Sequence, residues 1–154
     1  MPSRHAVPVR LLTTLFALFC CSFAGCSEED GNPSCDGVPS AIEFGQPFFA
    51  GPAVPFSVTR EFVVMNNGTG DLEIRAEIEV MPPIGWTPGA RLAQFHLDSS
   101  TPSTGFVIRP GESRTIELLL TADSNVMGGA YTGTLRLGLP CDPISFSADI
   151  TIGE

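Results

Sequence analysis

The sequence of 154 residues contains no lysine, and it has only two histidines, one tryptophan and one tyrosine. Its eight basic residues are all arginines, and they are outnumbered by seventeen acidic residues, which gives a net charge of −9. So acidic a chain is not expected to bind nucleic acid, because phosphate contacts depend on clusters of Lys and Arg. The charge is compatible with divalent cations or basic partners, and also with a surface that is simply kept soluble.

Side chains that could perform catalysis or bind metal are equally sparse. His96 is the one histidine outside the N-terminal region, so a serine-type triad would have to combine it with Asp98, and no Gly-x-Ser-x-Gly turn is present. No group of Cys, His and acidic side chains has the spacing of a zinc site. Glu77 and Glu79 would share one strand face, as a carboxylate pair for glycoside hydrolysis, a cation site or a solvated surface. The sequence predicts neither an enzyme nor a metal or cofactor site.

Long apolar runs are absent with one exception, the segment from Leu11 to Phe23. The run has about the length of a signal-peptide core and is short for a permanent membrane span. Arg4 and Arg10 precede it, and small residues follow it. This pattern is typical of an export signal.

The end of this run resembles the processing site of bacterial lipoproteins, because Ala24 and Gly25 lead into Cys26. The resemblance implies that residues 1–25 are a lipoprotein signal peptide and that Cys26 carries lipid at the new N-terminus. Residues 26–39 are acidic and polar and contain several glycines and prolines, a composition that predicts a flexible tether between the lipid and the fold. An ordinary secretory signal and an uncleaved anchor are the alternatives.

The resemblance also implies a location. The lipid on Cys26 would anchor the protein in the bacterial outer membrane, and Ser27 followed by three acids is similar to signals for outer-membrane sorting or surface export. The protein could therefore face the periplasm or the cell surface. Loss of two arginines with the signal peptide would change the charge to 6 − 17 = −11.

Two of the five cysteines remain available for a structural role. Cys20 and Cys21 lie in the signal and Cys26 takes the lipid, so Cys35 and Cys141 remain as a disulfide or as two free thiols. A disulfide would stabilise the fold by about 4–5 kcal/mol in the chain-entropy model, because it closes a loop of about a hundred residues.

Helical periodicity is missing after the apolar run, and period-2 alternation replaces it. Apolar residues alternate with polar ones in eight short segments, at residues 42–44, 56–64, 72–80, 93–97, 106–108, 116–120, 131–137 and 144–152. Turn-forming residues separate them, among them Asn66 to Asp71, whose oxygens could alternatively hold calcium. We therefore predict an all-β, immunoglobulin-like sandwich of two antiparallel sheets with seven or eight strands, spanning residues 40–154.

Three strings carry a resemblance to a family. Residues 63–74 (VVMNNGTGDLEI), 106–113 (FVIRPGES) and 129–137 (GAYTGTLRL) resemble motifs of bacterial immunoglobulin-like domains of the choice-of-anchor D and ASH (ASPM/SPD-2/Hydin) type. The resemblance implies an immunoglobulin-like fold and an extracytoplasmic or scaffold role, without an activity. In such sandwiches the first strand can run parallel to the last, which would bring Cys35 and Cys141 to one end.

The remaining aromatic residues suggest a contact surface. Trp86 lies in a loop bounded by prolines and glycines, and Phe48 and Phe49 precede Gly51 and Pro52. Each could bind a partner or could fold back onto the sandwich. We expect a non-catalytic envelope module for binding, adhesion or assembly, with an unknown envelope protein or glycan as partner. The alternative is an accessory carbohydrate-active or cation-dependent envelope protein.

Overall fold

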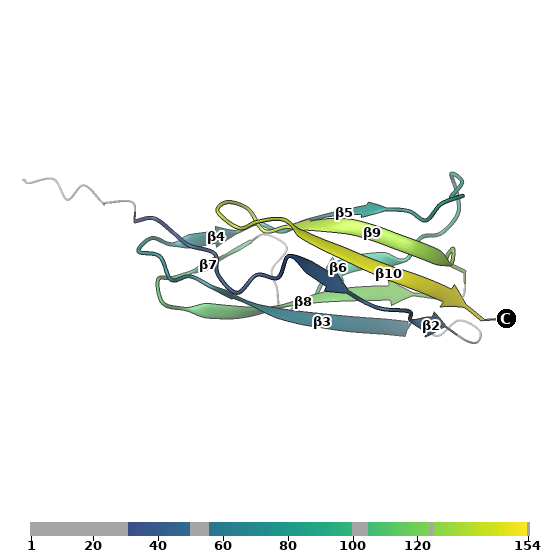
Figure 1. Cartoon of the computed structure of the whole chain (residues 1–154), viewed down its shortest axis with the longest axis horizontal. Coiled ribbons are helices and arrows are strands. Elements are labelled where there is room, and N and C mark those ends of the chain that lie inside the picture. The colour runs from purple at the N-terminus through teal and green to yellow at the C-terminus, as the bar shows by residue number, and fades with distance from the viewer. Residues whose placement is uncertain (1–30, 50–55, 100–104, 124, 154) are drawn as a thin grey trace, which may run out of the picture.

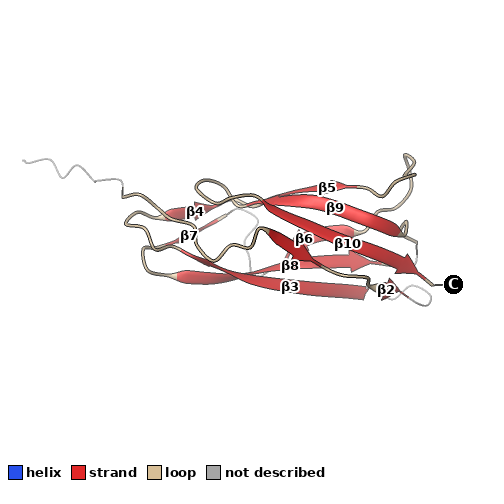
Figure 2. Cartoon of the chain, viewed as in Figure 1, coloured by secondary structure: helices blue, strands red, loops and turns tan. Residues whose placement is uncertain are grey.

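The computed structural model describes residues 31–49, 56–99, 105–123 and 125–153. Within these ranges the regular secondary structure consists of β-strands alone (Figures 1 and 2). The predicted signal peptide (residues 1–25) and Cys26 lie outside the described residues. The strands are β1 (Ala41–Glu43), β2 (Phe48–Phe49), β3 (Phe56–Met65), β4 (Leu72–Ile74), β5 (Glu77–Met81), β6 (Gln94–Leu97), β7 (Phe106–Ile108), β8 (Ser113–Ala122), β9 (Gly129–Arg136) and β10 (Ile144–Ile152).

These strands form two main layers. One sheet has the order β1-β10-β9-β5, with β2 also paired to β10, and the other has the order β3-β8-β6. This matches the immunoglobulin arrangement, in which strands B, E and D face strands C, F and G. Here β3, β8 and β6 correspond to B, E and D, and β5, β9 and β10 correspond to C, F and G. The predicted all-β, immunoglobulin-like sandwich is confirmed, and β1 runs parallel to β10 as expected.

The strand count differs from the prediction at two places: β2 was not predicted, and one predicted strand is divided in two. The segment 72–80, predicted as a single strand, is divided into β4, which pairs with β7, and β5, which pairs with β9. The backbone N–H of Arg75 donates to Leu137 O at 2.9 Å, and at this residue the chain passes from the two-stranded β4-β7 sheet to the sheet that contains β9. Bends of this kind let one strand contribute to two sheets.

The core lies between the layers and follows the alternation of the sequence. Every second residue is buried in β8 from Ile116 onward and in β10 as far as Ile150, and these residues pack with the inward residues of β3, β4 and β9. Phe95 is in ring contact with Phe44, Tyr131 and Phe146 at the centre. Gly133 lies opposite Phe146, and a Cβ atom there would be 2.2 Å from the Phe146 ring, so the missing side chain makes room for the aromatic ring.

Tyr131 supplies a second feature typical of immunoglobulin-like sandwiches. Its side chain is fully buried, and its hydroxyl donates to Met127 O, four residues earlier, while accepting from Ala93 N at 3.4 Å. A tyrosine near the start of this strand that bonds to the backbone upstream is the tyrosine corner of the fold. Burial raises the pKa of the Tyr131 hydroxyl, and the hydrogen bond from Ala93 partly offsets the increase.

Candidate contact surface

The direction of the strands gives the sandwich two distinct ends. β5 and β10 are both antiparallel to β9, so they start at one end and finish at the other. Cys141 precedes β10 and therefore lies at the first end, whereas the loop after β5, which contains Trp86, lies at the opposite end with the C-terminus (Figure 1). We call these the disulfide end and the distal end.

At the disulfide end, Cys35 and Cys141 form the predicted bridge, with a Cα–Cα distance of 5.0 Å and a sequence separation of 106. The bridge joins the segment before β1 to the segment before β10. Disulfides form and persist in oxidising compartments, so the bridge favours an extracytoplasmic location.

The prediction of a flexible tether over residues 26–39 does not match the structure in the second half of this segment. Asp36 forms a β-bridge with Met65, and Asn32 O accepts hydrogen bonds from the backbone N–H groups of Thr69 and Gly70. The chain is therefore attached to the loop between β3 and β4 from Asn32 onward. What precedes residue 31 lies outside the described residues.

Asn66 organises this attachment. It is the one fully buried polar residue among those described, and its side chain makes four hydrogen bonds. Oδ1 accepts from Ser34 N at 3.1 Å and Gly68 N at 3.0 Å, and Nδ2 donates to Gly70 O at 2.7 Å and Ile108 O at 2.9 Å. The residue thereby joins the N-terminal segment, its own loop and β7.

The glycines of this loop allow close backbone contact and do not adopt positive φ angles. Turn glycines usually supply a positive φ angle, but Gly68 and Gly70 are not among the glycines with positive φ. A Cβ atom on Gly68 would lie 2.2 Å from Asn32 O, and one on Gly70 would lie 1.8 Å from Gly31 O. These glycines therefore permit close backbone contact with the N-terminal segment.

At the distal end, the Trp86 loop consists of two consecutive turns. Trp86 N donates to Pro83 O and Ala90 N donates to Thr87 O, both at 3.1 Å. Gly85 and Gly89 occupy the third position of each turn with φ angles of 87° and 102°. Type II turns require a positive φ there and favour proline before it, as in Pro88-Gly89. The sequence thus encodes a defined loop.

The loop is anchored at its base and exposed at its tip. Pro83 is buried, and Met127 N donates to Arg91 O at 2.8 Å, which holds the end of the loop against the segment between β8 and β9. The side chains of Ile84, Met81 and Trp86 have exposed fractions of 102%, 57% and 38%. We call these three residues the distal apolar tip. No charged residue occurs from position 82 to position 90.

The predicted contact residues come from segments on opposite sides of β10 and β9 in the sheet order. Phe48 and Phe49 form β2, which pairs in parallel with the last residues of β10 at the distal end. β10 and β9 separate β2 from β5 and its loop. The side chains of Phe48 and Phe49 lie outside the description. The indole Nε1 of Trp86 donates to Ala90 O at 3.4 Å, so its ring is held to its own loop.

Two other candidate side chains, His96 and Glu79, lie on exposed strand faces. His96 is exposed on the outer face of β6, and Glu79 forms an ion pair with Arg136 at 3.0 Å. Among the described residues, no three His, Cys, Asp or Glu side chains are grouped to hold a metal ion. In the same part of the chain, no helix has the length and apolar character needed to cross a membrane.

Comparison with known proteins gives likeness of architecture only. The sequence matches no family model and no curated protein. Two of the similar solved structures illustrate the low sequence identity. The crystal structure of the S-layer protein SbsC domains 4 and 5 is 10% identical, with a TM-score of 0.35, over 78% of this chain and 54% of that one. The ASH / PapD-like domain of human CEP192 (PapD-like domain 7) is 13% identical, with a TM-score of 0.40, over 81% of this chain and 87% of that one. The chain thus spans about half of the SbsC chain.

Proposed function

We propose that the protein is a cell-envelope lipoprotein whose immunoglobulin-like domain works by binding and has no catalytic role. In this proposal Cys26 carries lipid in the bacterial outer membrane, and the distal apolar tip contacts another envelope component, a protein or a glycan. The domain would serve in adhesion or envelope assembly, with no role in binding nucleic acid.

The observation that supports this most strongly is the separation of the two ends. The N-terminal segment is fastened to the disulfide end through Cys35 and Asn66, so a membrane anchor would act on that end. The loop after β5 lies at the opposite end, with Ile84 fully exposed. An anchored base and an uncharged apolar tip are what a presented contact loop requires, since exposed apolar groups at the centre of an interface carry much of its energy.

Site-specific photo-crosslinking tests the proposal in cells. A photoreactive amino acid replaces Ile84 at the distal end in one variant and Leu139 at the disulfide end in the other. The two positions are matched, because their exposed fractions are 102% and 91%. We expect a discrete adduct from position 84 and none of that mass from position 139. Identical adducts from both positions, or none from position 84, would contradict the proposal.

A further inference from the structure

We infer that a hollow at the distal end, lined by Arg91 and Asp123, binds a neutral carbohydrate unit. The hollow has a volume of about 340 Å³, and it is formed by Arg91, Leu92, Gln94, Thr121, Ala122, Asp123 and Val126. That volume falls within the range of about 300–1,000 Å³ for small-molecule sites. The inference deepens the proposed function and relies on it for the distal end being the presented one.

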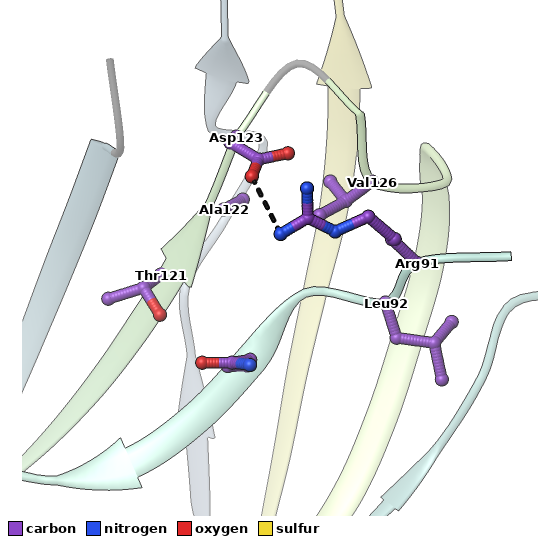
Figure 3. Close-up of a pocket in the computed structure, with 7 residues that line it drawn as sticks. Arg91, Leu92, Thr121, Ala122, Asp123 and Val126 are labelled. Atoms are coloured by element: carbon purple, nitrogen blue, oxygen red, sulfur yellow. Dashed lines mark ion pairs between the residues drawn. The ribbon is translucent and has the colours of Figure 1, made fainter. Parts of the chain in front are cut away.

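The Asp123 carboxylate is held in place before any ligand arrives, and the more exposed Arg91 guanidinium pairs with it. Arg91 Nη2 lies 3.2 Å from Asp123 Oδ2, and Figure 3 shows the two side chains pointing toward each other. Asp123 Oδ1 accepts from Asn125 N at 2.8 Å, which fixes the carboxylate at the end of β8. The backbone of Arg91 forms a bridge with Val126. A ligand would therefore lose little affinity to ordering the carboxylate.

Hydrogen-bonding capacity remains unused around this pair. Gln94 and Thr121 are cross-strand partners of β6 and β8, and neither side chain has a hydrogen-bond partner among the described residues. Within the same part of the chain, the Arg91 guanidinium has Asp123 as its one recorded side-chain partner. The hollow thus offers N–H donors, carboxylate and amide acceptors, and a hydroxyl that can do both.

This combination favours a neutral ligand. An anion bound to Arg91 would also face the Asp123 carboxylate, and a cation bound to Asp123 would face the guanidinium. The net charge of −9 disfavours anions further. A neutral ligand with adjacent hydroxyls can accept from the guanidinium and donate to the carboxylate without disturbing the ion pair.

The rest of the lining selects carbohydrate among neutral polar ligands. Leu92 and Val126 are half-buried and contribute apolar surface beside the polar groups, whereas Ala122 is buried in the core. A sugar ring presents hydroxyls at its edge and C–H groups on its face, so it can use both kinds of surface at once. Pockets that fix orientation with a few polar groups and bind the remainder by apolar contact are the usual form of a small-molecule site.

Calorimetry and NMR titration of the purified full chain test this inference. The probes are cellotriose, maltotriose and tri-N-acetylchitotriose as neutral ligands, trigalacturonate as an anion and glucosamine trimer as a cation. We expect binding of at least one neutral trisaccharide, with resonance shifts at Gln94 and Thr121. Arg91→Met should weaken it about tenfold, the effect of losing a charged hydrogen bond.

Two further variants make the outcome decisive. Arg136→Met is the matched control, because Arg136 is also exposed and paired with a carboxylate, and it should change affinity by less than about twofold. Asp123→Asn keeps the oxygen that accepts from Asn125 N, so a folded variant that binds about tenfold more weakly would support the site.

Absence of binding to any neutral probe, preference for the charged probes, or equal weakening by Arg136→Met would overturn the inference. If the crosslink from position 84 persists in that case, the proposed function stands and the carbohydrate site alone is removed. If sugar binding persists without that crosslink, the contact role proposed for the distal apolar tip is wrong and the carbohydrate site at Arg91 and Asp123 stands.

Discussion

At the scale of single residues, Asn66 shows how one polar side chain can determine a local structure. It is fully buried, yet each of its four hydrogen bonds goes to the backbone of a different residue. Buried polar groups are favourable only when they are satisfied, so this residue is favourable as long as all its partners stay in place.

We predict that Asn66→Ala lowers the free energy of unfolding by about 3 kcal/mol, because it leaves buried N–H and C=O groups without partners. Asn67→Ala is the control, since its side chain is exposed and bonds only to Asp36 at 3.1 Å within the described structure. It should cost less than about 0.5 kcal/mol. Urea unfolding of both variants measures the difference, and equal losses would show that Asn66 has no special role.

Tyr131 leads to a prediction about pH. Burial raises its pKa in the folded state, whereas the unfolded chain has the ordinary value of about 10. Below pH about 10 both states hold the proton, and above it the unfolded state loses the proton first. Stability should therefore fall as the pH rises from about 10 toward the pKa of the folded state.

The composition makes this effect easy to isolate, because Tyr131 is the sole tyrosine and the sequence has no lysine. Tyr131→Phe should cost about 1–2 kcal/mol at neutral pH through the lost hydroxyl bonds, and it should flatten the alkaline decline. Chemical unfolding between pH 8 and pH 11 provides the measurement. A variant that declines as steeply as the parent would assign the effect to another group.

At the scale of elements, the sequence predicted most of the strands but only some of the connections between them. Alternation identified β3, β8, β9 and β10 because one face of each is more buried than the other, although in β3 the burial is confined to Phe62 and Val64 and Phe56 is exposed. It could not reveal the break at Arg75, because the alternation continues through the bend from β4 into β5.

The position of the N-terminal segment and the hollow between Arg91 and Asp123 could not be predicted from the sequence, for related reasons. Residues 32–36 have little apolar character, and their position depends on absent Cβ atoms at Gly68 and Gly70. The hollow brings Arg91 next to Asp123, which is thirty-two residues away in sequence (123 − 91 = 32). Neither feature produces a periodic pattern. Trp86 was predictable as a loop residue, because prolines and glycines surround it.

The loop glycines permit a direct test of this account. Gly68→Ala should displace residues 32–36 and cost about 1–3 kcal/mol, because its Cβ would lie 2.2 Å from Asn32 O. Thr69→Ala in the same loop is the control, since Thr69 is exposed. Hydrogen exchange should show faster exchange at Thr69 and Gly70, whose N–H groups donate to Asn32 O, in the glycine variant alone. Unchanged exchange there would contradict the role assigned to Gly68.

At the scale of the whole molecule, the disulfide connects the N-terminal segment to the last strand of the sandwich. It joins residues 106 positions apart, so its removal frees a long loop in the unfolded state. We predict that the double variant Cys35→Ser with Cys141→Ser loses about 2–5 kcal/mol. Thermal unfolding measures this, with the reduced parent protein as the control. A loss within error of zero would mean that Asn66 and the neighbouring backbone bonds fasten the segment without the bridge.

The central claim is that the chain is anchored by lipid at Cys26 and presents its distal end. Mass spectrometry of the protein recovered from separated membrane fractions tests it most directly. The account predicts an N-terminus at Cys26 with the mass of attached acyl chains, in the outer-membrane fraction, and retention of the precursor when Cys26 is replaced by Ser. An intact Met1, or an unmodified Cys26 on protein that still co-purifies with the membrane, would contradict it.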